Sequence, residues 1–226
     1  LGALDGSDGF VLEGIDASDY SGYSVSTAGD VNGDGYADIL IGAYYGDPDG
    51  ASQAGETYVV FGKGDSFGAS MDLSTLDGTN GFVLEGIDEN DRSGNSVSSA
   101  GDVNGDGYAD ILISAHYADP DGVDGAGETY VVFGKASGFA ASVDLGSLNG
   151  TTGFVLSGID ANDFSGRSVS SAGDVNGDGY ADILIGAYKA DPGGVSNAGE
   201  TYVVFGKGSG FAASVDLGSL NGTTGF

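Results

Sequence analysis

Asp-Val-Asn-Gly-Asp-Gly-Tyr-Ala-Asp, residues 30–38, returns unchanged at 102–110 and again at 174–182. Consecutive copies start 72 residues apart (at 30, 102 and 174), so the chain is a tandem repeat without insertions between the copies. We call these three stretches the first, second and third loops. An internal period of this length, combined with strand-like content, suggests propeller blades or a repeat array.

Oxygen-bearing side chains stand at positions 1, 3, 5 and 9 of each loop, which in the first loop are Asp30, Asn32, Asp34 and Asp38. Position 7, Tyr36, offers its backbone carbonyl. A hard cation such as Ca²⁺ takes six to eight oxygen ligands, and glycines between the ligands let the backbone curl tightly. The sequence therefore predicts about three Ca²⁺ per chain, one in each loop.

The same positions recur in the other two loops. The candidate ligands there are Asp102, Asn104, Asp106, Tyr108 and Asp110, followed by Asp174, Asn176, Asp178, Tyr180 and Asp182. Zinc is disfavoured because the chain has no Cys and its single His, His116, lies outside the loops. An EF-hand is excluded because position 12 is Ile41 rather than Glu. The alternative is a turn rich in Asp, Asn and Gly that binds nothing.

The composition limits the classes of partner. The chain has 226 residues, 45 Gly and a formal net charge of −28, with only 6 Lys and Arg. Nucleic acids and anionic membranes are recognised through Lys and Arg, so both are disfavoured as partners. No apolar run approaches the roughly 20 residues of a membrane helix, and we expect no membrane insertion. Because the chain begins at Leu1 rather than Met, we expect it to be a piece of a longer precursor.

Short apolar segments bounded by Gly and polar turns indicate β-strands, and no segment has a helical period. The first copy contains four such segments, at 9–14, 23–29, 39–43 and 56–62. The stretch 67–79 reads as a connector that carries Met71, Leu73 and Leu76 as buried anchors. Four short antiparallel strands per copy correspond to one propeller blade.

The expected fold is therefore an all-β propeller built of four-stranded antiparallel blades, one blade per 72-residue repeat, with three blades' worth of chain. No interdomain linker is visible, so residues 1–226 form one unit. The repeats fall at about 10–81, 82–153 and 154–226, with 1–9 as a partial repeat.

An ordered set of motifs resembles the FG-GAP repeat, the blade unit of integrin α-subunit propellers and of many bacterial secreted or surface proteins. In the third copy these motifs are Phe-Ser-Gly-Arg-Ser-Val at 164–169, Ala-Gly followed by the loop at 172–182, Leu-Ile-Gly-Ala at 184–187 and Tyr-Val-Val-Phe-Gly at 202–206. The chain departs from the family pattern by having Ser-Gly where Phe-Gly is usual, and Ser114-Ala115 where Gly-Ala is usual.

The resemblance implies that the loop residues named above are calcium ligands and that calcium has a structural role, because it cross-links a loop of clustered negative charge. Folding is then expected to couple to metal binding. The resemblance also implies an adhesion-type module that is extracellular or on the cell surface. Propellers of the integrin-like family usually close with seven blades.

The positions within the repeat at which the sequence starts and stops suggest self-association. The strand at 10–14 has no preceding blade in the chain, and the third blade lacks its own copy of Val-Leu-Glu. Residues 10–14 would complete the third blade as a clasp. A ring of three blades is too small for closure within one chain, since propellers have four to eight blades. We therefore expect a homo-oligomer, with a dimer of six blades favoured over a fragment of a larger propeller.

No catalytic constellation is visible, so we expect no enzymatic activity. We expect His116 to take the place of an exposed aromatic residue, as Tyr44 and Tyr188 do in the other copies. The variable loops 44–54, 116–126 and 188–198 carry exposed rings. One interpretation is that the sequences of these exposed loops have diverged without a functional reason. The other is that the loops bind an extracellular protein or glycan, as an accessory module of a secreted enzyme or surface protein would. No ligand-binding residue is assigned within them.

Two further sets of acidic residues recur. The pairs Asp16/Asp19, Asp88/Asp91 and Asp160/Asp163 are expected to lie in solvated turns, with a second cation site as the alternative. Glu56, Glu128 and Glu200 are expected to cap turns, with a reach to the metal loop as the alternative.

Overall fold

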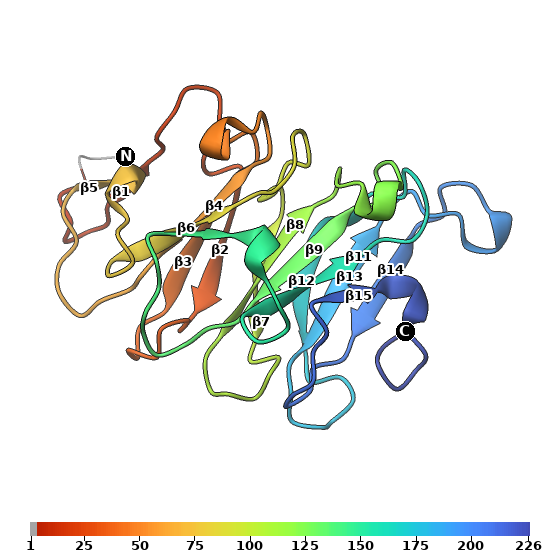
Figure 1. Cartoon of the computed structure of the whole chain (residues 1–226). Helices are drawn as coiled ribbons and strands as arrows, with labels where there is room; N and C mark the ends of the chain where they lie inside the picture. Colours follow the sequence, from red (N-terminus) through yellow and green to blue (C-terminus); the bar gives the residue numbers. More distant parts are fainter. Residues whose placement is uncertain (1–3) are drawn as a thin grey trace.

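The computed structural model describes residues 4–226, in which short β-strands form three main sheets arranged in chain order (Figure 1). Sheet 1 contains β2 (Ser24–Gly29), β3 (Asp38–Ala43), β4 (Glu56–Val60), β6 (Gly81–Glu85) and β10 (Ser142–Asp144). Sheet 2 contains β7 (Val97–Gly101), β8 (Asp110–Ala115), β9 (Glu128–Val132), β11 (Gly153–Ser157) and β15 (Ser214–Asp216). Sheet 3 contains β12 (Ser165–Gly173), β13 (Asp182–Ala187) and β14 (Glu200–Val204).

A separate edge pair joins β1 (Val11–Glu13) to β5 (Ser70–Asp72). The described residues contain no α-helix, but six 3₁₀ turns connect the strands. These turns are η1 (Pro48–Gly50), η2 (Leu73–Thr75), η3 (Pro120–Gly122), η4 (Leu145–Ser147), η5 (Pro192–Gly194) and η6 (Leu217–Ser219). The all-β prediction is confirmed.

Each full sheet has four antiparallel strands and a fifth strand that the sequence did not predict. The fourth antiparallel strand comes from the next copy, so β6 completes sheet 1 in place of the segment 9–14 that was expected there. In sheet 1, β10 pairs in parallel with β6, and in sheet 2, β15 pairs in parallel with β11. The edge pair repeats this arrangement, since β5 pairs in parallel with β1. The stretch 67–79 is therefore more than a connector, because part of it covers the outer edge of the preceding sheet. Leu73 and Leu76 are buried as predicted, whereas Met71 is only partly buried.

The sheets stack face to face, and each strand is apolar on both faces where it lies between two neighbours. Leu40 of β3 packs in one cluster with Ile111 and Ile113 of β8. Leu112, which points to the opposite face of β8, packs with Ile183 of β13. Side chains alternate between faces along a strand, so a strand that is buried on both sides reads as a continuous apolar run.

The row of sheets remains open in the described residues. Figure 1 places β1 and β5 at one end of the row and β14 at the other. The clasp expected from 10–14 does not pair with β14 within this chain, because β1 pairs with β5. Instead, an isolated bridge joins Val204 of β14 to Gly225. Ring closure and the number of blades are not defined by this arrangement.

Candidate metal centres

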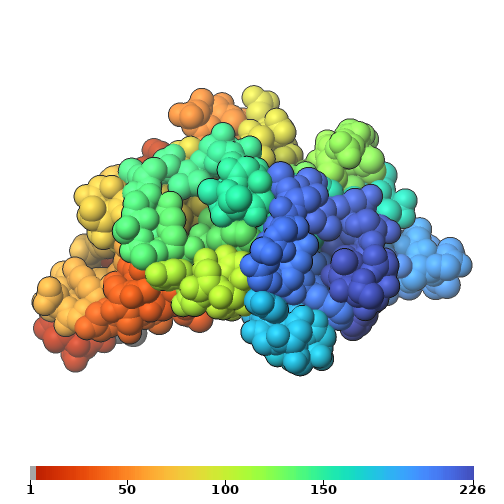
Figure 2. All heavy atoms as spheres, turned by 60° about the horizontal axis from the view of Figure 1, so that its bottom comes forward, coloured from red at the N-terminus to blue at the C-terminus, as the bar shows by residue number. Residues whose placement is uncertain are grey.

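Each of the three loops connects an antiparallel strand pair at one end of its sheet. The first loop joins β2 to β3, and a register shift between Thr27 and Gly29 precedes it. The second and third loops occupy the same position in sheets 2 and 3. Figure 2 turns the lower side of Figure 1 forward and shows these loops along one side of the molecule, in orange, yellow-green and cyan.

The carboxylate at position 1 closes the loop by accepting backbone amides. In the first loop, Oδ1 of Asp30 accepts the amide of Gly33 at 2.7 Å and that of Asp34 at 3.1 Å. Its Oδ2 accepts the amide of Gly35 at 2.9 Å. Gly33 and Gly35 have φ values of +73° and +89°, a region that favours glycine. The sequence therefore needs glycine at both positions to wrap the loop around the Asp30 side chain.

The side chains at positions 3 and 5 lie against each other. Nδ2 of Asn32 donates to Oδ2 of Asp34 at 3.0 Å, and Oδ1 of Asn32 accepts the amide of Asp34 at 2.9 Å. Oδ1 of Asp34 accepts the amide of Tyr36 at 2.9 Å. Three of the predicted ligand side chains, at positions 1, 3 and 5, are thus gathered in one solvent-exposed loop.

The carboxylate at position 9 lies beneath the loop rather than on its surface. Asp38 is only 1 % exposed, and its Oδ2 accepts the amide of Val31 at 2.9 Å. Its Oδ1 accepts the amide of Gly62, just after β4, at 2.8 Å. Burial raises the pKa of Asp38 to about 6, and the charges of Asp34 and Asp30 add to this, while the two amide bonds oppose it.

The arrangement repeats in the other two loops. Asp110 and Asp182 are fully buried, and each accepts an amide of its own loop at 2.8 Å. Asp102 and Asp174 each accept a glycine amide at 2.7 Å. Burial raises the pKa of Asp110 to about 7. The three loops are therefore built alike in structure as well as in sequence.

The donor set suits a hard cation, although the side chains are not gathered as a coordination shell. A carboxylate has about four lone-pair sites, and Asp30 uses three of them for amides. The charges of Asp30 and Asp34 both bear on Asp38, so the loop holds like charges that a divalent cation would offset. Within residues 4–226, no three His, Cys, Asp or Glu side chains converge on one point. The role of the Tyr36 carbonyl and the convergence of Asp38 on the cation remain predictions.

The second acidic residue of each recurring pair is buried, which corrects the expectation of a solvated turn. Asp19 and Asp91 are 8 % exposed and Asp163 is 9 % exposed. Burial raises the pKa of Asp91 to about 7, and the charges of Asp88 and Glu128 contribute to the rise. The non-glycine residues on either side of Asp91 have positive φ, which turns the chain so that this side chain points inward.

The glutamates that start the third strand of each sheet do not reach the metal loops. Glu56 pairs with Ala43, at the opposite end of β3 from Asp38. Its carboxylate accepts the hydroxyl of Tyr58. Burial raises the pKa of Glu56. Neither alternative raised for these residues, a turn cap or a remote metal ligand, matches this strand-bound position.

His116 is buried rather than exposed, which corrects a second expectation. It is 5 % exposed, whereas Tyr188 at the equivalent position is 52 % exposed. Its ring lies 4.5 Å from that of Tyr117 and 6.2 Å from that of Phe164, measured between centroids. Burial lowers the pKa of His116 to about 4, with help from the charge of Arg167. The imidazole therefore stays uncharged at neutral pH and fills space between sheets 2 and 3.

The variable loops lie on the side opposite the metal loops (Figure 1), and aromatic rings come together at and beside them. Tyr44 lies 4.3 Å from Tyr45 between ring centroids, and Tyr20 and Tyr23 complete this group. Toward sheet 3, the ammonium of Lys189 lies over the rings of Phe164 and Tyr188. The predicted aromatic surface is therefore present, built from these rings together with Tyr117.

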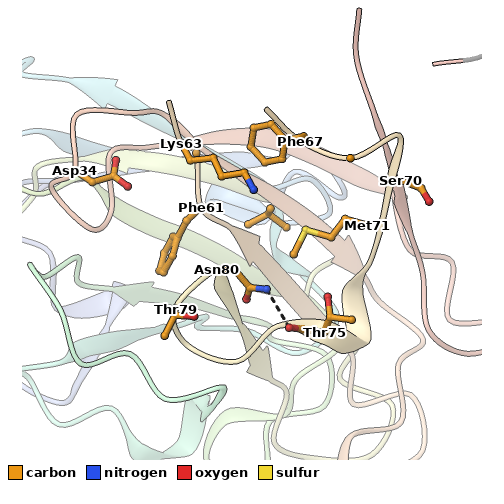
Figure 3. A pocket seen from close by; sticks show the side chains of 12 residues that line it. Asp34, Phe61, Lys63, Phe67, Ser70, Met71, Thr75, Thr79 and Asn80 are labelled. Atoms are coloured by element: carbon orange, nitrogen blue, oxygen red, sulfur yellow. Dashed lines mark hydrogen bonds between the residues drawn. The ribbon is translucent and has the colours of Figure 1, made fainter. Parts of the chain in front are cut away.

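A groove of about 420 Å³ lies beside the first loop (Figure 3). Asp34, Phe61 and Thr79 line it, and the ammonium of Lys63 lies 4.8 Å from the ring centroid of Phe67. Equivalent grooves of about 440 and 400 Å³ recur beside the second and third loops. Because they recur at the same place in each copy, these grooves are a feature of the repeat rather than of one specialised site.

Comparison with known proteins identifies the repeat. The family model described as the FG-GAP repeat matches residues 21–60, 93–132 and 165–204, together more than half of the chain. The chain belongs to the FG-GAP repeat family. Each match begins near the start of the first strand of a sheet and ends with its third strand, so it contains one metal loop.

Several integrin α-subunits are similar to this FG-GAP chain. Integrin alpha-PS2 of Drosophila melanogaster is 32 % identical over 196 residues, which cover 80 % of this chain. Integrin alpha-5 of Xenopus laevis is 33 % identical over 183 residues, and human integrin alpha-IIb is 31 % identical over 198 residues, covering 80 % and 84 % of this chain. The chain spans only 12 %, 16 % and 17 % of the length of these three relatives. No helix within residues 4–226 has the length and apolar character needed to cross a bilayer.

Proposed function

We propose that this chain is a calcium-binding structural module of an adhesion-type β-propeller. The observation that carries the proposal is the threefold repetition of one acidic loop that is closed by its own carboxylate and tied to its sheet by a second one. The residues that would hold the ions are the predicted ligands of the three loops. Bound calcium would supply positive charge that offsets the clustered carboxylates.

The chain's own residues define how binding would stabilise the fold. Asp30 fixes the loop backbone through three amides, and Asp38 connects the loop to Gly62 at the end of β4. Ordering of the loop is therefore transmitted to two strands of the same sheet. Binding to the folded chain alone stabilises it by mass action. We expect the main effect to be a gain in the free energy of unfolding rather than any chemical reaction.

Native mass spectrometry with added calcium, together with thermal unfolding in calcium and in chelator, tests the proposal. We expect three ions per chain and a higher Tm in calcium. Asp34→Ala removes a loop carboxylate and should remove one ion, whereas Asp65→Ala, at an exposed position outside the loops, should remove none. A wild-type chain that binds no calcium would overturn the proposal.

We also propose that the module self-associates through the open edge of sheet 3. Val203 exchanges hydrogen bonds of 2.6 and 2.9 Å with Phe226, but among residues 4–226 Thr201 has no strand partner on that side. The equivalent residues of sheets 1 and 2 pair with Leu84 and Leu156. An open strand edge is a template for another strand, and β1 of a second copy has the matching sequence. A dimer would bring six blades' worth of chain together.

Thr201→Pro tests this edge. Val203 N–H and C=O both face outward, so the backbone of Thr201, two residues earlier, faces the same way. Proline there removes the outward N–H without removing a bond to β13. We expect native mass spectrometry to show dimers of the wild-type chain and monomers of the variant. A wild-type chain that is monomeric at all concentrations overturns self-association and leaves the calcium proposal intact.

The aromatic surface supports a second candidate function, binding of a carbohydrate or protein by an accessory propeller. Sugar rings and protein side chains both stack on exposed aromatic faces, and Tyr20, Tyr23 and Tyr188 are each more than half exposed. An extracellular or cell-surface location is part of the same proposal. A glycan array probed with the calcium-loaded chain tests it, with the triple variant of these residues to Ala as the control. If the wild-type chain binds no glycan on the array, the proposal of glycan binding is overturned.

A further inference from the structure

Neighbouring metal loops are joined through their backbones. The carbonyl of Asp30 accepts the amide of Ala109, in the second loop, at 3.0 Å. The carbonyl of Val31 accepts the amide of Lys135, just after β9, at 2.9 Å. Two equivalent bonds connect the second loop to sheet 3. The carbonyl of Asp102 accepts the amide of Ala181 at 3.0 Å, and the carbonyl of Val103 accepts the amide of Lys207 at 2.9 Å. The loops therefore form a connected row along one side of the molecule (Figure 2).

A tyrosine ring reinforces each connection. A Cβ added at Gly33, position 4 of the first loop, would lie 2.4 Å from Cε1 of Tyr108, position 7 of the second loop. A Cβ at Gly105 would lie 2.4 Å from Cε1 of Tyr180 in the same way. A Cβ at Gly177 of the third loop has nothing within 4 Å. Two of the three identical loops therefore have a ring packed against their turn, and the third does not.

We infer that Tyr108 and Tyr180 are positioning residues for the metal loop of the preceding sheet, and that the three identical loops therefore bind calcium unequally in the monomeric chain. The inference rests on the proposed calcium function and deepens it. It predicts tighter binding by the first and second loops than by the third.

The physical reason is that the ring restricts the part of the loop that must be ordered for binding. The amide of Gly33 donates to Oδ1 of Asp30, and Gly33 lies between Asn32 and Asp34, two other predicted ligands. Fixing the backbone of one residue costs conformational entropy. A ring that restricts Gly33 before binding removes part of that cost, and pre-organised sites bind more tightly for this reason. The third loop must order Gly177 without such help.

A calcium titration followed by amide NMR tests the inference loop by loop, using the full 226-residue chain with Thr201→Pro, which is expected to keep it monomeric. The amides of Gly35, Gly107 and Gly179 each donate to the position-1 carboxylate of their own loop, so each reports one loop. We expect Gly35 and Gly107 to reach half-saturation at a calcium concentration at least about five-fold lower than Gly179, the lower end of typical coupling between sites.

Tyr108→Leu is the deciding variant, and Tyr36→Leu is its matched control. Both remove the position-7 ring of their own loop, but the ring of Tyr36 lies beside Gly64, after β4 of its own sheet, where an added Cβ would lie 2.3 Å from the Tyr36 hydroxyl, and not beside another loop. We expect Tyr108→Leu to raise the half-saturation concentration reported by Gly35 toward that of Gly179. Tyr36→Leu should leave the signal of Gly107 where it was. A merely structural role of the ring would not produce this difference between loops.

A second pair keeps the test decisive if Tyr108→Leu fails to fold. Gly33→Ala and Gly177→Ala carry similar local strain, with φ values of +73° and +78°, but only the first meets a tyrosine ring. Gly33→Ala should weaken its own loop more than Gly177→Ala weakens the third. If no loop of the wild-type chain responds to calcium, the proposed function fails. If all three loops saturate together and neither pair differs, the calcium function stands and the positioning role is overturned.

Discussion

Asp38 and Gly62 are joined across sheet 1, because Oδ1 of the Asp38 side chain accepts the backbone amide of Gly62 at 2.8 Å. This bond brings a carboxylate into the interior, where burial raises its pKa to about 6. The folded chain therefore holds a proton on Asp38 at pH values where the unfolded chain, with an ordinary pKa of 3.8, has released it. This relationship fixes the sign of a pH dependence in the calcium-free protein.

In chelator, the free energy of unfolding should fall as the pH rises from about 4 to about 6. The folded state binds more protons than the unfolded state in that window, so stability is lost as the carboxyl ionises. Asp38→Asn cannot ionise and should have a shallower fall over the same range. Urea denaturation at pH 4.5 and pH 8 measures the difference.

The control is Asp65→Asn, because Asp65 is exposed and lies outside the loops. It should keep the wild-type pH dependence. In the presence of calcium, the free energy of unfolding should instead rise with pH, since metal binding requires deprotonated carboxylates and releases protons. An Asp38→Asn chain whose stability falls as steeply as the wild type in chelator contradicts the assignment of the slope to this carboxyl.

Gly42→Ala should disrupt the contact between sheets 1 and 2. A Cβ at Gly42 would lie 2.0 Å from the carbonyl oxygen of Gly94. Backbone on both sides cannot yield as a flexible side chain would, and overpacking typically costs about 1–3 kcal/mol. We expect a loss of at least that size in the free energy of unfolding, measured by urea denaturation.

Gly186→Ala is the matched control, because Gly186 occupies the same strand position in sheet 3. The nearest atom to its added Cβ is the carbonyl oxygen of Ser168, at 3.6 Å, which is ordinary contact. Neither Gly42 nor Gly186 has a positive φ, so the pair isolates the steric term. Equal losses for the two variants would show that close packing between the sheets is not the cause.

Much of this fold follows from the sequence. The runs at 39–43 and 56–62 predict the strands β3 and β4, because a strand buried on both faces needs consecutive apolar residues. The loop between strands is equally local, since Asp30 closes it through amides only three to five residues away. The exact repeat then carries each assignment to the other two copies.

The remaining features depend on contacts between residues far apart in the chain. The strand β5 has three residues, Ser-Met-Asp, with no β-pattern of its own, and it forms because β1 offers an open edge. Tyr108 packs on Gly33 and Tyr180 packs on Gly105, whereas Gly177, at the same position of an identical loop, has no ring against it. Burial of Asp91 depends on positive φ at its non-glycine neighbours, which residue type alone does not indicate.

Tyr130→Phe should destabilise the fold by about 1–3 kcal/mol, the usual cost of leaving a buried hydrogen-bonding group without its partner. The hydroxyl of Tyr130 donates to Oε2 of Glu128 at 2.5 Å, and Tyr130 is 2 % exposed. Water has little access to replace the lost donor. Chemical denaturation of the variant and the wild type at one pH measures the effect.

Tyr202→Phe removes the same contact, a bond of 2.6 Å to Glu200, at the open edge of sheet 3. Tyr202 is only partly buried there, so water can satisfy the carboxylate and the loss should be smaller. If the two substitutions lower the free energy of unfolding equally, burial of the Tyr130–Glu128 pair does not explain the contribution of the Tyr130 hydroxyl.

Arg92→Phe should be neutral or stabilising, although it removes one of the chain's few positive charges. The guanidinium of Arg92 lies 5.0 Å from the ring centroid of Tyr45 and 4.4 Å from that of Tyr117. Arg92 therefore bridges the tyrosines that follow the second strands of sheets 1 and 2. Cation–π contacts contribute about 0.5–1 kcal/mol at exposed sites. Nε of Arg92 is buried and has no hydrogen-bond partner among the residues that the structure describes, and the cost of burying it opposes the gain from the cation–π contacts.

The third copy of the repeat already has phenylalanine where the second copy has Arg92. Phe164 occupies the equivalent position in the third copy, with a positive φ of 53° against 58° at Arg92, and its ring lies 5.1 Å from that of Tyr117. Phenylalanine therefore fits both the backbone and the aromatic surroundings. Arg92→Ala should lose the packing as well as the charge and should lower the Tm, so thermal unfolding of the two variants separates the contributions. A Tm for Arg92→Phe as low as that of Arg92→Ala would assign the stabilisation to the guanidinium rather than to the space that it fills.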